Sequence, residues 1–143
     1  MTEQCNTVKS ADISIYAKAA YMDDSMHTVF GWGSVASVDG TPYVDTQDDI
    51  VTDYELEKAV YDFMVAPKHD EMHERIVPDS KIVESIVVTD EKLRAMFPQG
   101  PHPKGNRGWW LGIRIYDEEV YAKHKSGEYT GFSITGTAVR KEV

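Results

Sequence analysis

Two residues far apart in the sequence have the chemistry of a nucleophile and its base. Ser133 lies among apolar residues and glycines in residues 131–136, and His73 lies sixty residues upstream in Met72-His73-Glu74. A serine hydroxyl is a poor nucleophile until a neighbouring imidazole can accept its proton. Ser133 is therefore a candidate nucleophile and His73 a candidate general base. The common alternative is an ordinary strand serine and a histidine in a solvated, charged loop.

The expected strand around Ser133 leaves space beside its hydroxyl. Because strand side chains alternate, Phe132 and Ile134 point to one face and Ser133 to the other. If the Phe132 face is the core, Ser133 faces a groove or solvent. Gly131 and Gly136 leave room where backbone N–H groups could stabilise an oxyanion. The sequence has no Gly-x-Ser-x-Gly turn, which argues against an α/β-hydrolase.

The histidines at positions 69 and 73 also allow a metal hypothesis. Their spacing would place two imidazoles on one face of a helix, as in a zinc site. The zincin signature has glutamate directly after the first histidine, whereas Asp70 stands here, and Pro67 breaks the helix just before. The acidic run at 45–49 lacks the spacing of an EF-hand, so a turn is favoured there. A metal site at His69 and His73 is therefore the weaker hypothesis, and a solvated charged loop is the favoured explanation.

Glu84 is a carboxylate in the middle of an expected strand. Alternation places it on the same face as Ile82 and Ile86, where a charge needs either a partner or an exposed position. His73 would be such a partner, and an edge strand would explain Glu84 equally well.

Hydrophobic periodicity and capping signals predict the elements that must position these residues. Thr52 and Glu55 have the spacing of a capping box. Gly31 and Gly33 would let neighbouring backbones approach closely, and Asp39-Gly40 marks a turn. The predicted strands are 12–20, 28–38, 81–88, 109–116 and the Ser133 strand; the predicted helices are 52–65, 89–96 and 117–125, with a Pro/Gly-rich loop at 98–108.

Strands with two or three helices between them predict an α+β fold. We expect a small, mainly antiparallel β-barrel or curved sheet, flanked by those helices. The length of 143 residues fits one domain over 1–143, with residues 1–10 as a loose N-terminus.

Composition narrows the class of function. The formal net charge of −9 argues against nucleic acid as a partner, because phosphates require a basic surface. Cys5 is the single cysteine, so no intramolecular disulfide is expected. No apolar run is long enough to span a membrane, and the polar start is unlike a signal peptide. These features predict a protein that works inside a cell without membrane contact.

A series of short motifs resembles the XkdF-like phage serine proteases, which are related to prohead proteases with the herpesvirus assemblin fold. The motifs occur in the family's order and cover roughly four-fifths of the chain. The matching segments are residues 30–36, 44–50, 56–63, 71–75, 83–85, 108–112, 116–120 and 126–134.

This resemblance implies a serine endopeptidase that cleaves scaffold or capsid precursors in the prohead, within the host cytoplasm. By matched position, Ser133 would be the nucleophile and His73 the general base. The resemblance implies no cofactor, an assemblin-like barrel, and phage capsid and scaffold proteins as partners. Assemblin-type proteases often self-associate, so a homodimer is also implied. The rival hypothesis is a non-catalytic relative that serves as a head scaffold, completion or decoration protein.

The third catalytic residue is the main departure from the family pattern. Related proteases take an acid from a strand well after the serine, whereas Glu142 is the acidic residue among the ten that follow Ser133. Upstream candidates are Glu84, Asp49 and Glu71, of which we rank Glu84 first. Asp48 and Thr135 also stand where the family commonly has other residues, glycine in the first case and glycine or glutamate in the second.

Overall fold

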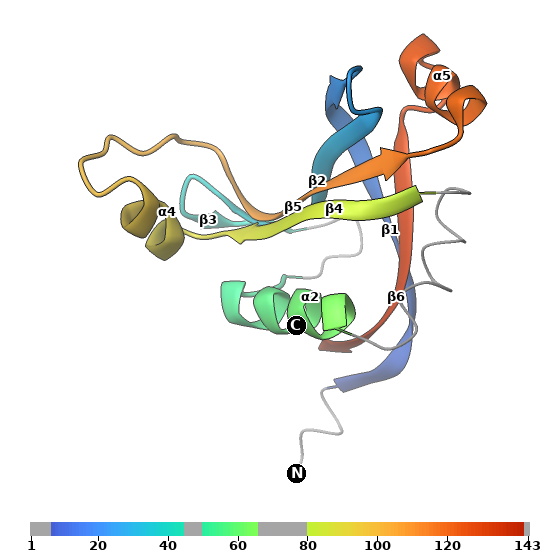
Figure 1. The fold of residues 1–143 in the computed structure, drawn as a ribbon. Helices are drawn as coiled ribbons and strands as arrows, with labels where there is room; N and C mark the ends of the chain where they lie inside the picture. Colours follow the sequence, from blue (N-terminus) through green and yellow to red (C-terminus); the bar gives the residue numbers. More distant parts are fainter. Residues whose placement is uncertain (1–6, 45–49, 66–79, 142–143) are drawn as a thin grey trace.

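A computed structural model describes residues 7–44, 50–65 and 80–141, with the backbone alone described for 7–16 and 133–141 (Figure 1). The fold is α+β, as predicted. The elements in chain order are β1 (Thr7–Asp23), β2 (Thr28–Val38), β3 (Thr41–Pro42), α2 (Asp53–Val65), β4 (Ser80–Val88), α4 (Asp90–Met96), β5 (Asn106–Ile115), α5 (Glu118–Ser126) and β6 (Gly131–Lys141).

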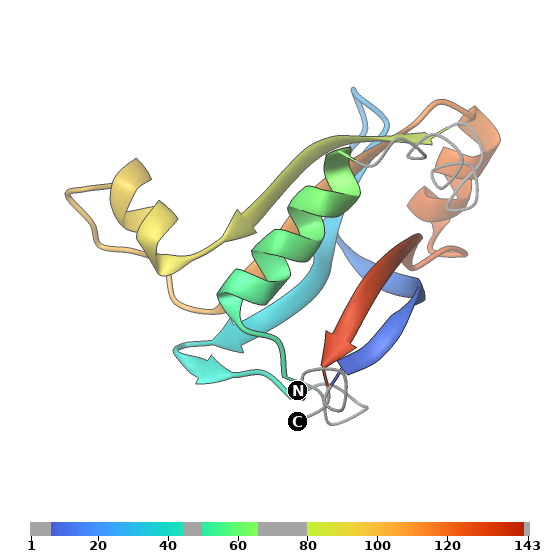
Figure 2. The same cartoon turned by 90° about the horizontal axis from the view of Figure 1, so that it is seen from below.

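The strands form one curved antiparallel sheet in the order β4-β5-β2-β1-β6, with β3 paired to the end of β2. Within the described residues β4 and β6 are its two edges and do not pair, so the sheet is not closed. The curved sheet that we predicted is therefore confirmed, and the barrel alternative is wrong. Helix α2 gives the physical reason why the sheet stays open. It contacts both edge strands, β4 and β6, as well as β5, and so lies between the two edges (Figures 1 and 2).

Local capping determines where the helices begin and end. Thr52 Oγ1 accepts a hydrogen bond from the Glu55 N–H at 3.1 Å, and Glu55 Oε1 accepts one from the Thr52 N–H at 3.2 Å, which confirms the capping box before α2. Thr89 caps α4 in the same way, through the Lys92 N–H. Asp117 caps α5, and Gly127 ends it in the left-handed conformation.

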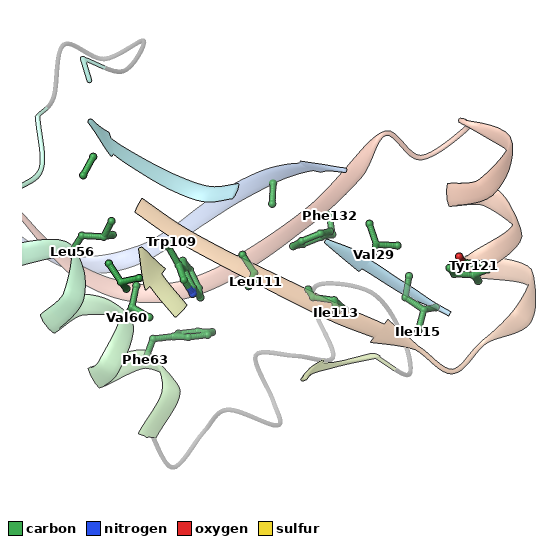
Figure 3. Packing of buried hydrophobic residues seen from close by; sticks show 13 residues of the cluster. Val29, Leu56, Val60, Phe63, Trp109, Leu111, Ile113, Ile115, Tyr121 and Phe132 are labelled. Carbon is green, nitrogen blue, oxygen red and sulfur yellow. The ribbon is translucent and has the colours of Figure 1, made fainter. Parts of the chain in front are cut away.

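The core lies between the sheet and α2 (Figure 3). Leu111, Ile113 and Ile115 alternate along β5 with Gly112 and Arg114, so one face of β5 is completely covered. Helix α2 contributes three buried side chains at helical spacing, Leu56, Val60 and Phe63. The Phe63 ring meets the Trp109 ring edge-on at 5.9 Å between centroids.

Close backbone contact occurs where the sequence predicted it. A Cβ on Gly31 would lie 2.3 Å from the Lys18 carbonyl oxygen, so only glycine fits where β1 crosses β2. None of the described helices is both long and apolar enough to cross a membrane.

Two strands begin earlier than predicted. β1 begins at Thr7 instead of residue 12, because Thr7 and Val8 pair with Lys141 and Arg140 of β6. Residues 7–10, which we expected in a loose N-terminus, are therefore strand. β5 begins at Asn106 inside the predicted loop, where it pairs with Val38 of β2.

Candidate active site

Ser133 is the third residue of β6, which is an edge strand of the sheet. Its backbone lies opposite Tyr16 of β1, and the residue before it, Phe132, is 2% exposed and packs in the core. The Phe132 face is thus the core face, as the sequence argument required. Within the described residues β6 pairs with β1 alone, so its other edge faces no strand.

His73 lies outside the described residues, as do His69, Asp49 and Glu71. The sequence places His73 between Val65, which ends α2, and Ser80, which begins β4.

Glu84 lies on β4, at the opposite edge of the sheet from Ser133. Its side chain is exposed and its backbone pairs with Gly112 of β5. A shift in register between Ile82 and Glu84 breaks the strand alternation. Ile82 consequently packs against the core whereas Glu84 is exposed, so the shared face predicted for them is wrong. An exposed edge position explains this carboxylate without a buried partner.

The structure also brings together a cluster that the sequence did not reveal, at the end of the sheet beside α5. The Tyr121 hydroxyl donates a hydrogen bond of 2.7 Å to Asp24, and Lys125 forms an ion pair with the same carboxylate. The His27 ring stacks on the Tyr121 ring at 4.5 Å between centroids. Together with Glu118 and Ala122 these residues line an open cavity of about 370 Å³.

Electrostatics in this cluster favour a charged Asp24 and a neutral Tyr121. The hydrogen bond from Lys125, followed by that from Tyr121, lowers the pKa of Asp24. Burial and the bond to Asp24 raise the pKa of Tyr121. The phenol therefore keeps its proton and acts as a fixed donor, which attaches α5 to the β1–β2 turn instead of supplying an acid or base. Tyr121 and Lys125 share a helix face in the sequence, but nothing there pairs that face with Asp24, 97 residues away.

Helix α5 also anchors the chain that leads into β6. His124 is buried, and neither ring nitrogen has a hydrogen-bond partner in the described part of the chain. Its ring packs edge-on against Tyr129 at 5.3 Å, and burial lowers its pKa. The Ala19 N–H then donates to the Thr130 carbonyl at 2.9 Å, immediately before β6 begins. The position of α5 thus determines where the Ser133 strand enters the sheet.

The described residues contain no group of three or more His, Cys, Asp or Glu side chains that could hold a metal ion. The proposed zinc pair, His69 and His73, lies outside them.

Comparison with known proteins gives the family. A family model described as "Putative phage serine protease XkdF" matches residues 18–142. The chain belongs to this family. The matched region contains every described helix and all of the sheet except residues 7–17 of β1, together with Ser133, His73 and Glu84.

One curated relative comes from a bacterium. The uncharacterized protein YqbD of Bacillus subtilis (strain 168) is 34% identical over 97 residues, which cover 66% of this chain and 28% of YqbD. This member of the XkdF family therefore spans less than a third of the relative that it matches. No solved structure matches the chain significantly, and the assemblin-like fold stays a prediction.

Proposed function

We propose that this chain is a serine endopeptidase that cleaves scaffold or capsid precursor proteins during assembly of a phage head. The observation that carries the proposal is the family match, which spans both Ser133 and His73. The position of Ser133 on an edge strand, directly after the core anchor Phe132, supports it. A nucleophile on an edge strand is accessible to a polypeptide substrate without unfolding of the sheet.

The proposed chemistry uses two side chains and backbone donors. Ser133 Oγ attacks the scissile carbonyl carbon while His73 accepts the hydroxyl proton. The C–N bond then breaks as His73 returns that proton to the leaving amine, which gives an acyl-enzyme. Water, deprotonated by His73, attacks the ester and releases Ser133. Phage capsid and scaffold proteins are the proposed substrates, within the prohead in the host cytoplasm, and no cofactor takes part.

Glu84 is our proposal for the carboxylate that orients His73. Glu84 on β4 and Ser133 on β6 are four strands apart, which is about 19 Å in a flat sheet. The role of Glu84 beside His73 and Ser133 therefore requires the curvature of the sheet to bring β4 and β6 closer. Helix α2 contacts both β4 and β6, although the Glu84 side chain lies on the face of β4 that points away from α2. Loss of an orienting carboxylate typically lowers kcat about 10⁴-fold, which makes Glu84→Gln the direct test against Asp49→Asn and Glu71→Gln. A decrease of under about tenfold in Glu84→Gln would assign the role elsewhere.

Substitution of the nucleophile tests the function itself. The chain and its Ser133→Ala variant are co-expressed with the capsid and scaffold proteins, and precursor processing is followed by intact mass. We expect processing to stop in Ser133→Ala and to continue in Ser34→Ala, a half-buried strand serine that serves as the matched control. Removal of a catalytic serine costs on the order of 10⁶ in kcat in well-studied proteases, so residual cleavage should be undetectable.

A covalent probe gives an independent readout. A fluorophosphonate should add one adduct to the wild-type chain, and the adduct should be lost in Ser133→Ala and strongly reduced in His73→Ala. Unchanged processing together with no adduct would favour a structural role in the phage head and end the protease proposal.

A further inference from the structure

Four aromatic rings form a continuous row across the sheet face opposite α2. Tyr21 and Phe30 lie 5.3 Å apart between ring centroids, Phe30 and Trp110 6.3 Å, and Trp110 and Trp32 5.2 Å. Trp110 alternates along β5 with Trp109 and Leu111, which pack in the core against α2. The row, which we call the aromatic platform, therefore crosses β1, β2 and β5 on the outer face of the sheet.

Glycine at position 112 makes this platform possible. A Cβ on Gly112 would lie 2.6 Å from the Phe30 ring, so the ring lies directly over the β5 backbone. Phe30 can thereby reach both Tyr21 on one side and Trp110 on the other. Tyr21 is 58% exposed, and the other three rings are half-buried by one another and by the sheet. Stacked aromatic surface that is open to solvent is typical of sites that bind protein partners.

Cations border the aromatic platform although the chain as a whole is acidic. Lys18 points to the outer face, because its neighbours Ala17 and Ala19 pack in the core. Arg114 shares the Trp110 face of β5, and its guanidinium lies 5.3 Å from the centre of the Tyr116 ring. Neither cation forms an ion pair with any of the described residues. Two carboxylates also border this face, because Glu84 lies opposite Gly112, and Asp23, two residues after Tyr21, lies opposite Thr28. Other acidic residues lie in the first turns of the three helices. They are Asp53 and Glu55 in α2, Asp90 and Glu91 in α4, and Glu118 and Glu119 in α5.

We propose that the aromatic platform is a docking surface for an acidic peptide segment that carries apolar side chains. The rings would bury the apolar side chains, while Lys18 and Arg114 would pair with the carboxylates at the border. The chain's net charge of −9 opposes a polyanion such as nucleic acid, but a short acidic segment meets only the local cations. The four rings lie on β1, β2 and β5, whereas Ser133 lies on β6, and none of the rings takes part in the proposed catalysis.

Peptide binding to the whole chain tests the proposal. The probe is a short fluorescein-labelled peptide with alternating Glu and Leu residues. One matched peptide has Lys in place of Glu, and a second has Ser in place of Leu. We expect the fluorescence anisotropy of the Glu/Leu peptide to rise and saturate as protein is added, and that of the two matched peptides to stay unchanged. Binding of the Glu/Leu peptide should weaken as the salt concentration is raised. Platform variants Tyr21→Ser and Trp32→Thr, and the border variant Arg114→Glu, should each weaken binding about tenfold or more.

Exposed aromatic residues elsewhere provide the controls. Tyr54 and Tyr61 are exposed on α2, and Tyr54→Ser and Tyr61→Ser should leave the affinity within about twofold. Equal binding of the Lys/Leu peptide, or equal loss in the α2 variants, would overturn the proposal. Self-association in sedimentation that Tyr21→Ser abolishes would assign the platform to a second copy of the chain and overturn it as well. Arg114→Gln, which removes charge with little change in shape, keeps the test valid if an aromatic variant fails to fold.

Discussion

The centre of the sheet and the β1–β6 pair are built differently. β2 and β5 each have strand neighbours on both sides, and α2 packs against the core face of β5. β6 pairs with β1 alone in the described residues, and β1 leaves β2 near Ala19 to follow β6. A two-stranded ribbon is marginally stable without further packing. The candidate nucleophile therefore lies on the less supported of the two regions.

Contacts at the start of β6 compensate for the weaker support of the β1–β6 pair. Phe132 is buried in the core, Thr130 accepts a hydrogen bond from Ala19, and α5 is fixed to the β1–β2 turn through Asp24. Global stability and the position of Ser133 therefore depend on different contacts. Substitutions in the centre should unfold the protein, whereas substitutions in the α5 anchor should move β6 with a smaller cost in stability.

The largest expected effect is in the centre. Leu111 is fully buried, and Leu111→Ala should lower the free energy of unfolding by about 2–5 kcal/mol through lost burial and a residual cavity. Chemical denaturation with the wild-type chain as reference measures this. Val83→Ala, at an exposed position on β4, should change stability by less than about 0.5 kcal/mol. Similar losses in both variants would contradict a core centred on β5.

A second substitution acts at the junction of the two regions. Gly31→Ala places a methyl group against the Lys18 carbonyl, and backbone cannot rotate away as a side chain can. We expect a loss of about 1–3 kcal/mol, together with separation of β1 from β2 at this point. Hydrogen exchange should show the earliest loss of protection in β1 and β6, whereas Ser34→Ala on the same strand should leave protection unchanged. Uniform loss over the whole sheet would mean that the two regions are one cooperative unit.

A third substitution acts on the α5 anchor. Tyr121→Phe removes the hydrogen bond to Asp24 and should cost about 0.5–1.5 kcal/mol. The pKa of Asp24 should rise toward its ordinary value while the Lys125 pair still holds it down, which NMR titration of the carboxyl group measures. Amide exchange should increase at the start of β6 more than in β5. Tyr61→Phe, which removes a hydroxyl that accepts a bond from Lys92, is the control and should leave β6 exchange unchanged.

Elements with strong local signals could be predicted from the sequence. The bounds of β2 agree with the prediction at both ends. Helices α2, α4 and α5 each begin one residue after the predicted first residue, and those residues, Thr52, Thr89 and Asp117, cap them. In each case a few neighbouring residues determine the outcome, so distant contacts are not needed. Ser133 lies on the predicted strand for the same reason.

Features that depend on distant pairing could not be predicted. The first residues of β1 carry no strong strand signal, and their pairing with the end of β6 makes them strand. The register shift beside Glu84 arises where β4 meets Gly112, which periodicity along β4 does not reveal. The Asp24–Tyr121 bond joins two residues that are each unremarkable in their own segments. Topology also decides whether β4 and β6 close a barrel.

The smallest expected effect concerns His124, and it appears only when the pH is lowered below neutral. Burial lowers the pKa of His124 in the folded chain, so between that value and the ordinary value of about 6.5 the unfolded chain binds more protons. The stabilisation is therefore complete above about pH 6.5 and is lost as the pH falls through the folded pKa. His124→Phe keeps a ring against Tyr129 and removes this titration, so its stability should fall less steeply below pH 6.5 in denaturation measured at several pH values. Val83→Ala, at an exposed position on β4, is the control and should retain the wild-type slope. If both variants keep that slope, His124 is not the acid-sensitive contact, and the start of β6 owes its position to Asp24 and Phe132 instead.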